Sequence, residues 1–191
     1  GCHRAATGNI AILVGGDQSA FNKILPALSA MGKKILYTGE LGSASVLKVI
    51  TNYLASVNLV SVGEALTVAK KTGMDLKTTY EAIKISSGNS FVHETESQVI
   101  LNGSYNISFT MDLVLKDMGL FNDLSIKKNI PLELSPLVLN IFKDGQKKYG
   151  PRAWSSMIVK RLEDACKISL RAEGFPAELT DSEPEEKGHQ I

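Results

Sequence analysis

The sequence predicts a mostly α-helical protein that begins with a short α/β segment, and three observations predict this fold class. Apolar runs at residues 9–15 and 34–37 flank one helical segment near the amino end. From residue 43 onward, apolar residues recur every three or four positions, which is the period of a helix. The residues after Gly174 are acidic and polar, which favours a poorly ordered or draped tail.

The first forty residues predict a strand, a helix and a second strand. The apolar run at 9–15 ends in two glycines, as a buried strand does. Asp17 or Ser19 can then cap a helix, because a side-chain oxygen at that place accepts from the free amides of the first turn. Residues 34–37 give the second strand. A unit of this kind belongs to a parallel sheet and is too small to form a sheet alone.

One helix of about thirty residues is expected to follow, starting at Ser43, which is well above the usual length. Its apolar residues occupy nearly every face, so we expect it to be buried on most sides and to form a central element. Further helices are expected at 76–86, 92–101, 110–127, 135–149 and 154–168. The expected organisation is a sheet fragment at 1–42, a helical domain at 43–172 and a polar acidic tail at 173–191.

Composition argues against several classes of partner. The net charge is +1 and no basic run occurs, so nothing indicates binding to nucleic acid. No apolar run is long enough and free enough of polar residues to predict a membrane span, and no signal peptide is visible. Cys2 and Cys166 form neither metal-ligand spacing nor a disulfide framework, so we expect no metal and a cytoplasmic location. His3 and His93 are expected at the surface.

Three segments resemble motifs of one enzyme family. Residues 1–17 (GCHRAATGNIAILVGGD) resemble the end of the substrate loop of 3-hydroxyisobutyrate dehydrogenase-like enzymes. Residues 38–52 (TGELGSASVLKVITN) resemble the family's catalytic segment, a glycine-rich turn that opens a helix. Residues 108–120 (SFTMDLVLKDMGL) resemble its cofactor-facing helix. Ala44 and Thr51 depart from the family's catalytic pattern, and neither departure falls on the position of the catalytic lysine.

The resemblance implies a fold and a family. The chain resembles β-hydroxyacid dehydrogenases, a group that includes glyoxylate and succinic semialdehyde reductases. The implied fold is an all-helical domain like the carboxyl-terminal domain of 6-phosphogluconate dehydrogenase, preceded by a terminal βαβ remnant of a Rossmann-type domain. No Gly-x-Gly-x-x-Gly follows a strand in these residues. We therefore expect a carboxyl-terminal fragment that lacks most of the nucleotide-binding domain and is inactive alone.

The resemblance also implies roles for individual residues. Lys48 stands at the position of the family's proton-transferring lysine, and Asn52 follows one helical turn later on the same face. Gly1 stands where the last glycine of the substrate loop is found, so Gly1 and Asn52 are expected to bind substrate. The cofactor is NAD or NADP, and the residues expected to bind it are Lys116, Phe109 and Asp117.

Plainer interpretations of these residues stay open. A lysine on a helix is usually solvated, and a phenylalanine such as Phe109 is more often part of the core than of a ligand wall. The Lys116–Asp117 pair can be no more than surface charge.

Two functions follow from these interpretations. The first is hydride transfer between NAD(P) and a small β-hydroxyacid or its aldehyde or keto form, with Lys48 as general acid and base. The second is a non-catalytic helical module for oligomerisation or binding, derived from the same fold. Retention of Lys48, Asn52 and Lys116 favours the enzyme, and the missing glycine-rich loop favours the module. Either protein is expected to be a homodimer or homotetramer.

Overall fold

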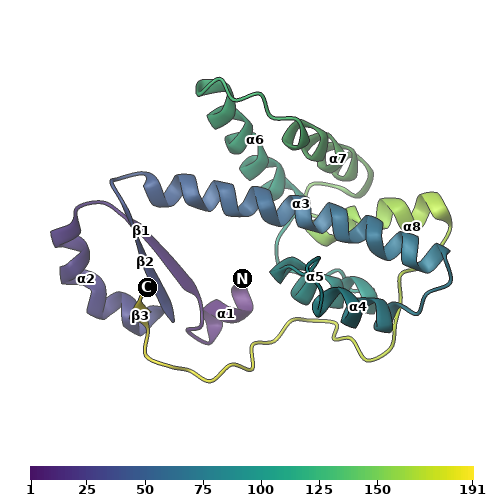
Figure 1. Ribbon diagram of the computed structural model, residues 1–191, viewed down its shortest axis with the longest axis horizontal. Helices are drawn as coiled ribbons and strands as arrows, with labels where there is room; N and C mark the ends of the chain where they lie inside the picture. The colour runs from purple at the N-terminus through teal and green to yellow at the C-terminus, as the bar shows by residue number, and fades with distance from the viewer. The chain divides into compact units, whose positions relative to one another are not determined.

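The structure is a computed structural model that describes residues 1–191 and forms two compact units (Figure 1). The first unit comprises Gly1–Thr51 together with Thr180–Ile191, and the second comprises Asn52–Leu179. The boundary therefore lies inside helix α3 (Ser43–Lys71), later in the chain than residue 42. The residues after Leu179 belong to the first unit and do not stand apart as a tail.

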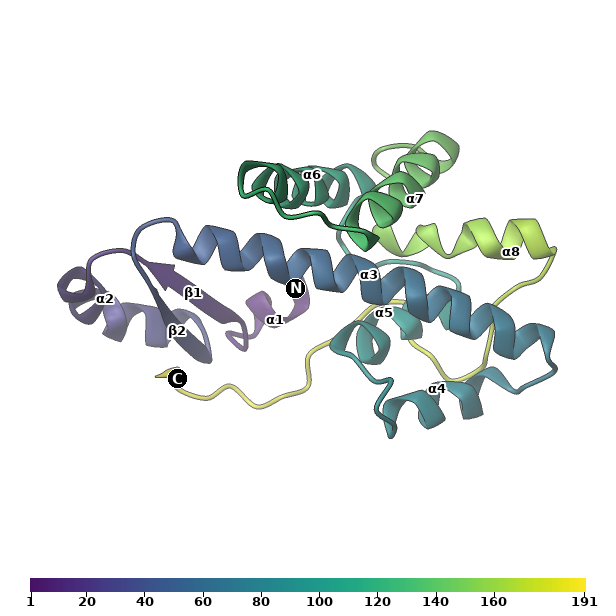
Figure 2. The ribbon, with the colours of Figure 1, turned by 45° about the horizontal axis from the view of Figure 1, so that its top comes forward.

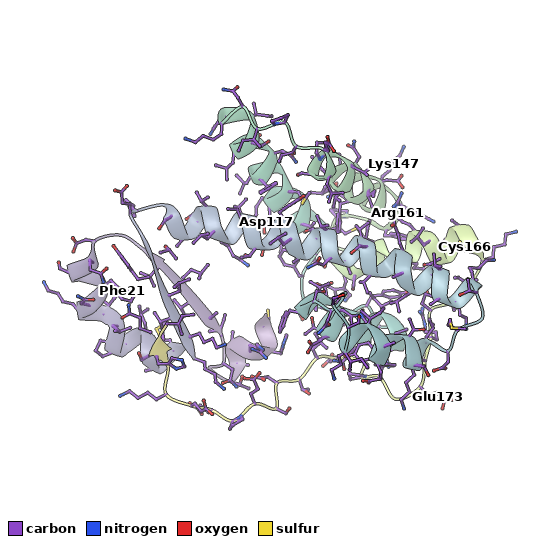
Figure 3. The ribbon with its side chains drawn as sticks, in the orientation of Figure 1. Phe21, Asp117, Lys147, Arg161, Cys166 and Glu173 are labelled. Carbon is purple, nitrogen blue, oxygen red and sulfur yellow. The ribbon has the colours of Figure 1, made fainter.

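The first unit contains the predicted strand–helix–strand arrangement. Strands β1 (Ala11–Gly15) and β2 (Lys34–Gly39) pair in parallel, and helix α2 (Gln18–Met31) connects them. Asp17 caps α2, because its carboxylate accepts a hydrogen bond of 2.8 Å from the Ala20 N–H. Phe21, labelled in Figure 3, and Ile35 are almost completely buried and form the small core of this unit. The fold expected from the apolar runs is confirmed here.

Two elements of the first unit were not expected. A short helix, α1 (Cys2–Ala6), opens the chain, and a short strand, β3 (His189–Gln190), pairs in parallel with β2. The sheet order is therefore β1-β2-β3. Figure 1 shows the carboxyl-terminal segment in yellow reaching this sheet. The last residues of the expected poorly ordered or draped tail form a strand, because their backbone groups pair with a strand far away in sequence.

The second unit is helical, as the three- and four-residue spacing predicts. Helices α6 and α7 lie side by side in it (Figure 2). The predicted helix at 154–168 is wrong in detail: a 3-10 turn, η1, comes first, and the α-helix is shorter. The elements after α3 are α4 (Leu76–Lys84), α5 (Phe91–Asn102), α6 (Met111–Lys127), α7 (Leu134–Tyr149), η1 (Ser155–Ile158) and α8 (Lys160–Cys166).

Helix α3 supplies part of the hydrophobic core but is not buried on most sides. Leu59, Val62 and Leu66 lie in the core, whereas Leu47 and Leu54 in its first half are exposed. The expectation of burial on most sides is therefore wrong for that half within residues 1–191.

Helix α3 also meets the length and composition of a membrane span, with a mean hydropathy of 1.3. The sequence predicted no segment that could span a membrane, and α3 corrects that expectation by length and composition only. A core helix of a soluble protein passes the same test when it is mostly buried, and here 22% of the apolar window is buried within this chain.

His93 is buried, which corrects its expected place at the surface. Its Nε2 lies 2.9 Å from the carbonyl oxygen of Tyr80, and its Nδ1 lies 3.0 Å from the Ser97 hydroxyl. The imidazole thus joins α4 to α5. The apolar spacing of the sequence could not predict that His93 is buried, because its ring nitrogens find their hydrogen-bond partners on two different helices.

Glu96 is a partly buried residue of α5 with one fully buried carboxyl oxygen, and it is expected to make the stability of the chain depend on pH. It lies one turn from both Val92 and Ile100 on a buried face, and its Oε2 has no hydrogen-bond partner. Burial raises the pKa of Glu96 from 4.5 to about 8. Between these two values the folded chain keeps a proton that the unfolded chain has lost. The free energy of unfolding is therefore expected to fall as pH rises through this range.

The variant Glu96→Gln is expected to remove that dependence. At about pH 8 it should be more stable than the wild type by at least about 1 kcal/mol, and the gain should shrink towards about pH 5. Urea unfolding at both pH values measures this, with the exposed Glu81→Gln on α4 as the matched control. An equal effect of Glu96→Gln at both pH values would contradict the assignment.

Candidate active site

The start of α3 is held against the carboxyl end of β1 by two glycines. Gly42 has a φ of +95°, which favours glycine, and its carbonyl oxygen accepts from the Val46 N–H at 3.1 Å to begin the helix. A Cβ on Gly15 would lie 2.5 Å from Ser43 Oγ, so only glycine permits this approach. The hydroxyls of Thr38 and Ser43 are 2.6 Å apart and close the turn. The glycine-rich turn thus places the first turns of α3 beside the end of a strand.

Lys48 lies in the second turn of α3 and is exposed within this chain. Residues 1–191 by themselves do not bury it. Gly1, the other expected site residue of the first unit, lies within electrostatic range of it. The Lys48 side chain and the backbone nitrogen of Gly1 interact electrostatically. The fold therefore brings Gly1 and Lys48 into one neighbourhood.

Asn52 lies one turn after Lys48 on α3, and its amide is oriented by α6. The Nδ2 of Asn52 donates a hydrogen bond to Oδ2 of Asp117, which Figure 3 labels. The Asn52 carbonyl oxygen accepts a hydrogen bond of 2.9 Å from Ser56 within the helix. Because the NH₂ group is directed at a carboxylate, the rotation of the Asn52 amide is fixed.

Asp117 is held from a second direction by Lys116. The Nζ of Lys116 lies 3.0 Å from Oδ1 of Asp117, whose side chain is only 13% exposed. Lys116 itself is 61% exposed, so its ammonium also reaches solvent. The structure thus joins Asn52, Asp117 and Lys116 in one polar chain. The expected assignment of Asp117 to the cofactor did not include its contact with Asn52.

An aromatic pair beside this polar chain fastens α3 to α6. The rings of Tyr53 and Phe121 stack at 4.0 Å with an interplanar angle of 6°. Tyr53 is next to Asn52 on α3, and Phe121 is close to Asp117 on α6. The stacking of Tyr53 on Phe121 was not predicted from the sequence, although Tyr53 directly follows Asn52 and Phe121 lies one turn after Asp117.

Phe109 stands in the segment before α6 and packs against the hydrophobic core, where it is partly buried. Its carbonyl oxygen accepts a hydrogen bond of 2.8 Å from the Ser155 N–H. The contact with η1 fixes the backbone that leads into α6. No group of three or more His, Cys, Asp and Glu side chains is arranged to hold a metal ion.

Comparison with known proteins finds two family models along the chain. Residues 42–162 match the NAD-binding domain of NADP-dependent 3-hydroxyisobutyrate dehydrogenase. Residues 1–39 match the NAD-binding domain of 6-phosphogluconate dehydrogenase. Residues 1–17 lie within the second match, and residues 108–120 lie within the first.

Individual relatives agree with these matches. The chain is 33% identical over 171 residues to 2-(hydroxymethyl)glutarate dehydrogenase of Eubacterium barkeri, covering 89% of this chain and 57% of the relative. It is 30% identical over 160 residues to L-threonate dehydrogenase of Escherichia coli K12, covering 83% and 53%. The crystal structure of 3-hydroxyisobutyrate dehydrogenase from Salmonella typhimurium superposes with a TM-score of 0.77 at 27% identity, covering 84% and 57%. The chain thus spans little more than half the length of these relatives.

Proposed function

Because the chain belongs to the β-hydroxyacid dehydrogenase family, whose cofactor is NAD or NADP, we propose that the complete protein is a hydroxyacid dehydrogenase. It transfers a hydride between NAD(P) and a small β-hydroxyacid or its aldehyde or keto form. The observation that carries the proposal is the placement of Lys48 and Asn52 one turn apart at the start of α3, with Asn52 oriented by Asp117. This arrangement pairs a proton-transferring group with a fixed hydrogen-bonding group.

Lys48 serves as the general acid and base in this proposal. In the oxidation direction its amine takes the proton of the substrate hydroxyl, and in the reduction direction its ammonium returns that proton to the oxygen. The turn at Gly42 places Lys48 near the amino end of α3, where the free amides of the helix favour a substrate carboxylate. Gly1 lies in the same neighbourhood and contributes to substrate binding.

Asn52 binds the substrate, and Asp117 is a positioning residue that acts through it. The Asn52 amide is turned by its hydrogen bond to Asp117, so it meets the substrate hydroxyl in a fixed orientation. Since the Asp117 carboxylate also pairs with Lys116, its own orientation is restricted from two sides.

The residues around α6 suit a nicotinamide dinucleotide. Lys116 offers an exposed ammonium for a phosphate oxygen, and Phe109 and Asp117 flank it along the chain. Bound NAD or NADP supplies the site that accepts or returns the hydride. The glycine-rich loop that would hold the pyrophosphate is not found in residues 1–191, so we expect this chain alone to bind the cofactor weakly and to be inactive.

Replacement of Asp117 by alanine is expected to lower kcat of the complete protein about tenfold while the helical unit stays folded. The reason is that the Asn52 amide loses the acceptor that fixes its rotation. Steady-state kinetics with hydroxyacid and cofactor measure the loss of kcat. The control is Asp123→Ala, because Asp123 is an exposed aspartate on the same helix. A change confined to thermal stability, with kcat unchanged, would show that Asp117 only supports the fold.

The substrate is proposed as a class of small hydroxyacids. The relatives' names point to acids such as 2-(hydroxymethyl)glutarate and L-threonate, and 3-hydroxyisobutyrate belongs to the same class. A panel of these acids assayed with the complete protein and either nucleotide tests the proposal through nucleotide reduction. Turnover with at least one acid is expected. Failure with the whole panel in both directions would favour the non-catalytic module.

We also propose that the protein acts in the cytoplasm as a homodimer or homotetramer. Both cysteines are free thiols, which suits a reducing compartment. Light scattering measures the oligomeric state, and a monomer at micromolar concentration would contradict the proposed homodimer or homotetramer. The apolar side chains that support self-association lie exposed on α6, α7 and the loop between them: Leu120, Ile126, Ile130, Leu134 and Leu137.

A further inference from the structure

The carboxyl-terminal segment completes the sheet of the first unit through its backbone. The N–H groups of Gly188, His189 and Ile191 donate to the carbonyl oxygens of Ser29, Lys33 and Ile35, at 2.8, 3.0 and 3.0 Å respectively. Strand β3 thereby covers the side of β2 that β1 leaves open. An open strand edge is a template for pairing with other chains, so this coverage has a physical consequence.

Side chains at the beginning of the segment recognise the region before β1. The carboxylate of Asp181 accepts from the Thr7 hydroxyl and, at 2.7 Å, from Nδ2 of Asn9. The same Nδ2 donates to the carbonyl oxygen of Glu183 at 3.0 Å, and Asn9 is only 4% exposed. The hydrogen bonds from Thr7 and Asn9 lower the pKa of Asp181 to about 2. The segment is therefore held here by directed contacts to a buried amide.

Acidic side chains of the segment meet basic side chains of the first unit. Glu183 pairs with Arg4 and lies 3.2 Å from Nζ of Lys33. Glu186 lies 3.4 Å from the same Nζ. Each pair near the surface is weak alone, but the three share one patch and one short segment. Their charges are complementary, since the segment is acidic and the patch is basic.

Gly188 fixes the register of this contact. It is buried, and a Cβ there would lie 1.8 Å from the Gly32 carbonyl oxygen and 2.9 Å from that of Ser29. A shift of one residue would place Lys187 or His189 at this point, where no side chain fits. The position of β3 is therefore specific to this sequence.

We propose that the open side of β2, with Arg4, Asn9 and Lys33, is a docking surface for an extended acidic segment, and that Thr180–Ile191 of the same chain is its occupant. We call this segment the strap. The chain passes between its two units at Thr51–Asn52 and again at Leu179–Thr180, so the docked strap is a second connection between them. Its docking also removes the one sheet edge that would otherwise be open at β2.

Amide hydrogen exchange of the whole chain tests the strap. In the wild type, the amides of Gly188, His189 and Ile191 are expected to exchange at least about tenfold slower than in an unstructured peptide. Gly188→Ala should bring their exchange to within about twofold of the unstructured rate, because the methyl group cannot enter the contact. Glu185→Ala, an exposed position in the same segment, should leave the protection unchanged.

A second variant guards against misfolding of Gly188→Ala. Asp181→Asn keeps the size of the side chain but removes its charge, and it should reduce the protection several-fold while the amides of β1 stay protected. Protection that survives both variants, or its absence in the wild type, would overturn the strap. Protection that rises with protein concentration would assign the surface to a second copy and overturn the same-chain assignment.

Discussion

Replacement of Lys48 by alanine in the complete protein is expected to lower kcat for hydroxyacid oxidation by at least about 100-fold. The reason is chemical: without the amine, no side chain on that turn of α3 can take the hydroxyl proton as the hydride departs. Asn52, one turn away, keeps its hydrogen bond to Asp117 and can still orient the substrate, but an amide does not titrate. Steady-state kinetics with cofactor and hydroxyacid in both directions measure the loss.

The matched control for Lys48→Ala is Lys70→Ala. Lys70 lies on the same helix, is exposed, and stands in its last turn, far along the chain from the glycine-rich turn. It should leave kcat and KM unchanged. Circular dichroism of both variants should match the wild type, since neither residue lies in the core. Equal losses in the two variants would indicate a general effect of charge on α3 and not a role in proton transfer.

The second large effect is expected at Glu163, where alanine should lower the free energy of unfolding by about 2–4 kcal/mol, because two buried donors lose their acceptor. Glu163 is 2% exposed and accepts from the Tyr105 hydroxyl, from the Leu170 N–H at 2.7 Å and from Arg171 at 2.8 Å. Arg171 also donates to the Tyr105 hydroxyl at 2.9 Å. Removing the carboxylate leaves the positive charge of Arg171 without its partner and two buried donors without an acceptor.

This network is also what fastens the segment after α8 to α5. Arg171 donates to the Ile100 carbonyl oxygen at 3.2 Å, and the Ala172 N–H donates to that of Leu101 at 3.1 Å. Urea unfolding of Glu163→Ala measures the loss, and Glu173→Ala, exposed and labelled in Figure 3, is the control. A loss below about 1 kcal/mol for Glu163→Ala would mean that the network contributes little to stability.

Periodicity predicted the elements that depend on local sequence. The strand–helix–strand unit, the start of α3 at Ser43 and the helices α4 to α7 follow from apolar spacing and from caps such as Asp17 and Asp75. Elements that depend on distant partners could not be predicted in this way. Strand β3 is polar and exists only because its backbone pairs with β2, and α1 is too short to show a period.

The last helix shows the same limit. Apolar spacing predicted one helix over 154–168, but Ser155 donates to the Phe109 carbonyl oxygen and Ser156 donates to that of Tyr105. These contacts hold η1 against the segment before α6, and α8 starts only at Lys160. Tertiary hydrogen bonds therefore override the local helical preference here.

The candidate site was predicted as residues but not as contacts. Lys48 and Asn52 follow from a motif in which both residues lie on one helix. The hydrogen bond between Asn52 and Asp117 joins positions on two helices, α3 and α6, far apart in sequence, so no spacing rule reveals it. The stacking of Tyr53 on Phe121 joins the same two helices and was missed for the same reason.

Rescue of Lys48→Ala by a small primary amine tests the assigned proton transfer most directly. The complete protein carrying this variant is assayed for hydroxyacid oxidation with and without added ethylamine. We expect a very low rate that rises with ethylamine concentration, while the wild-type rate and that of Lys70→Ala do not change. A variant that retains turnover within about threefold of the wild type without any amine would contradict the role of Lys48.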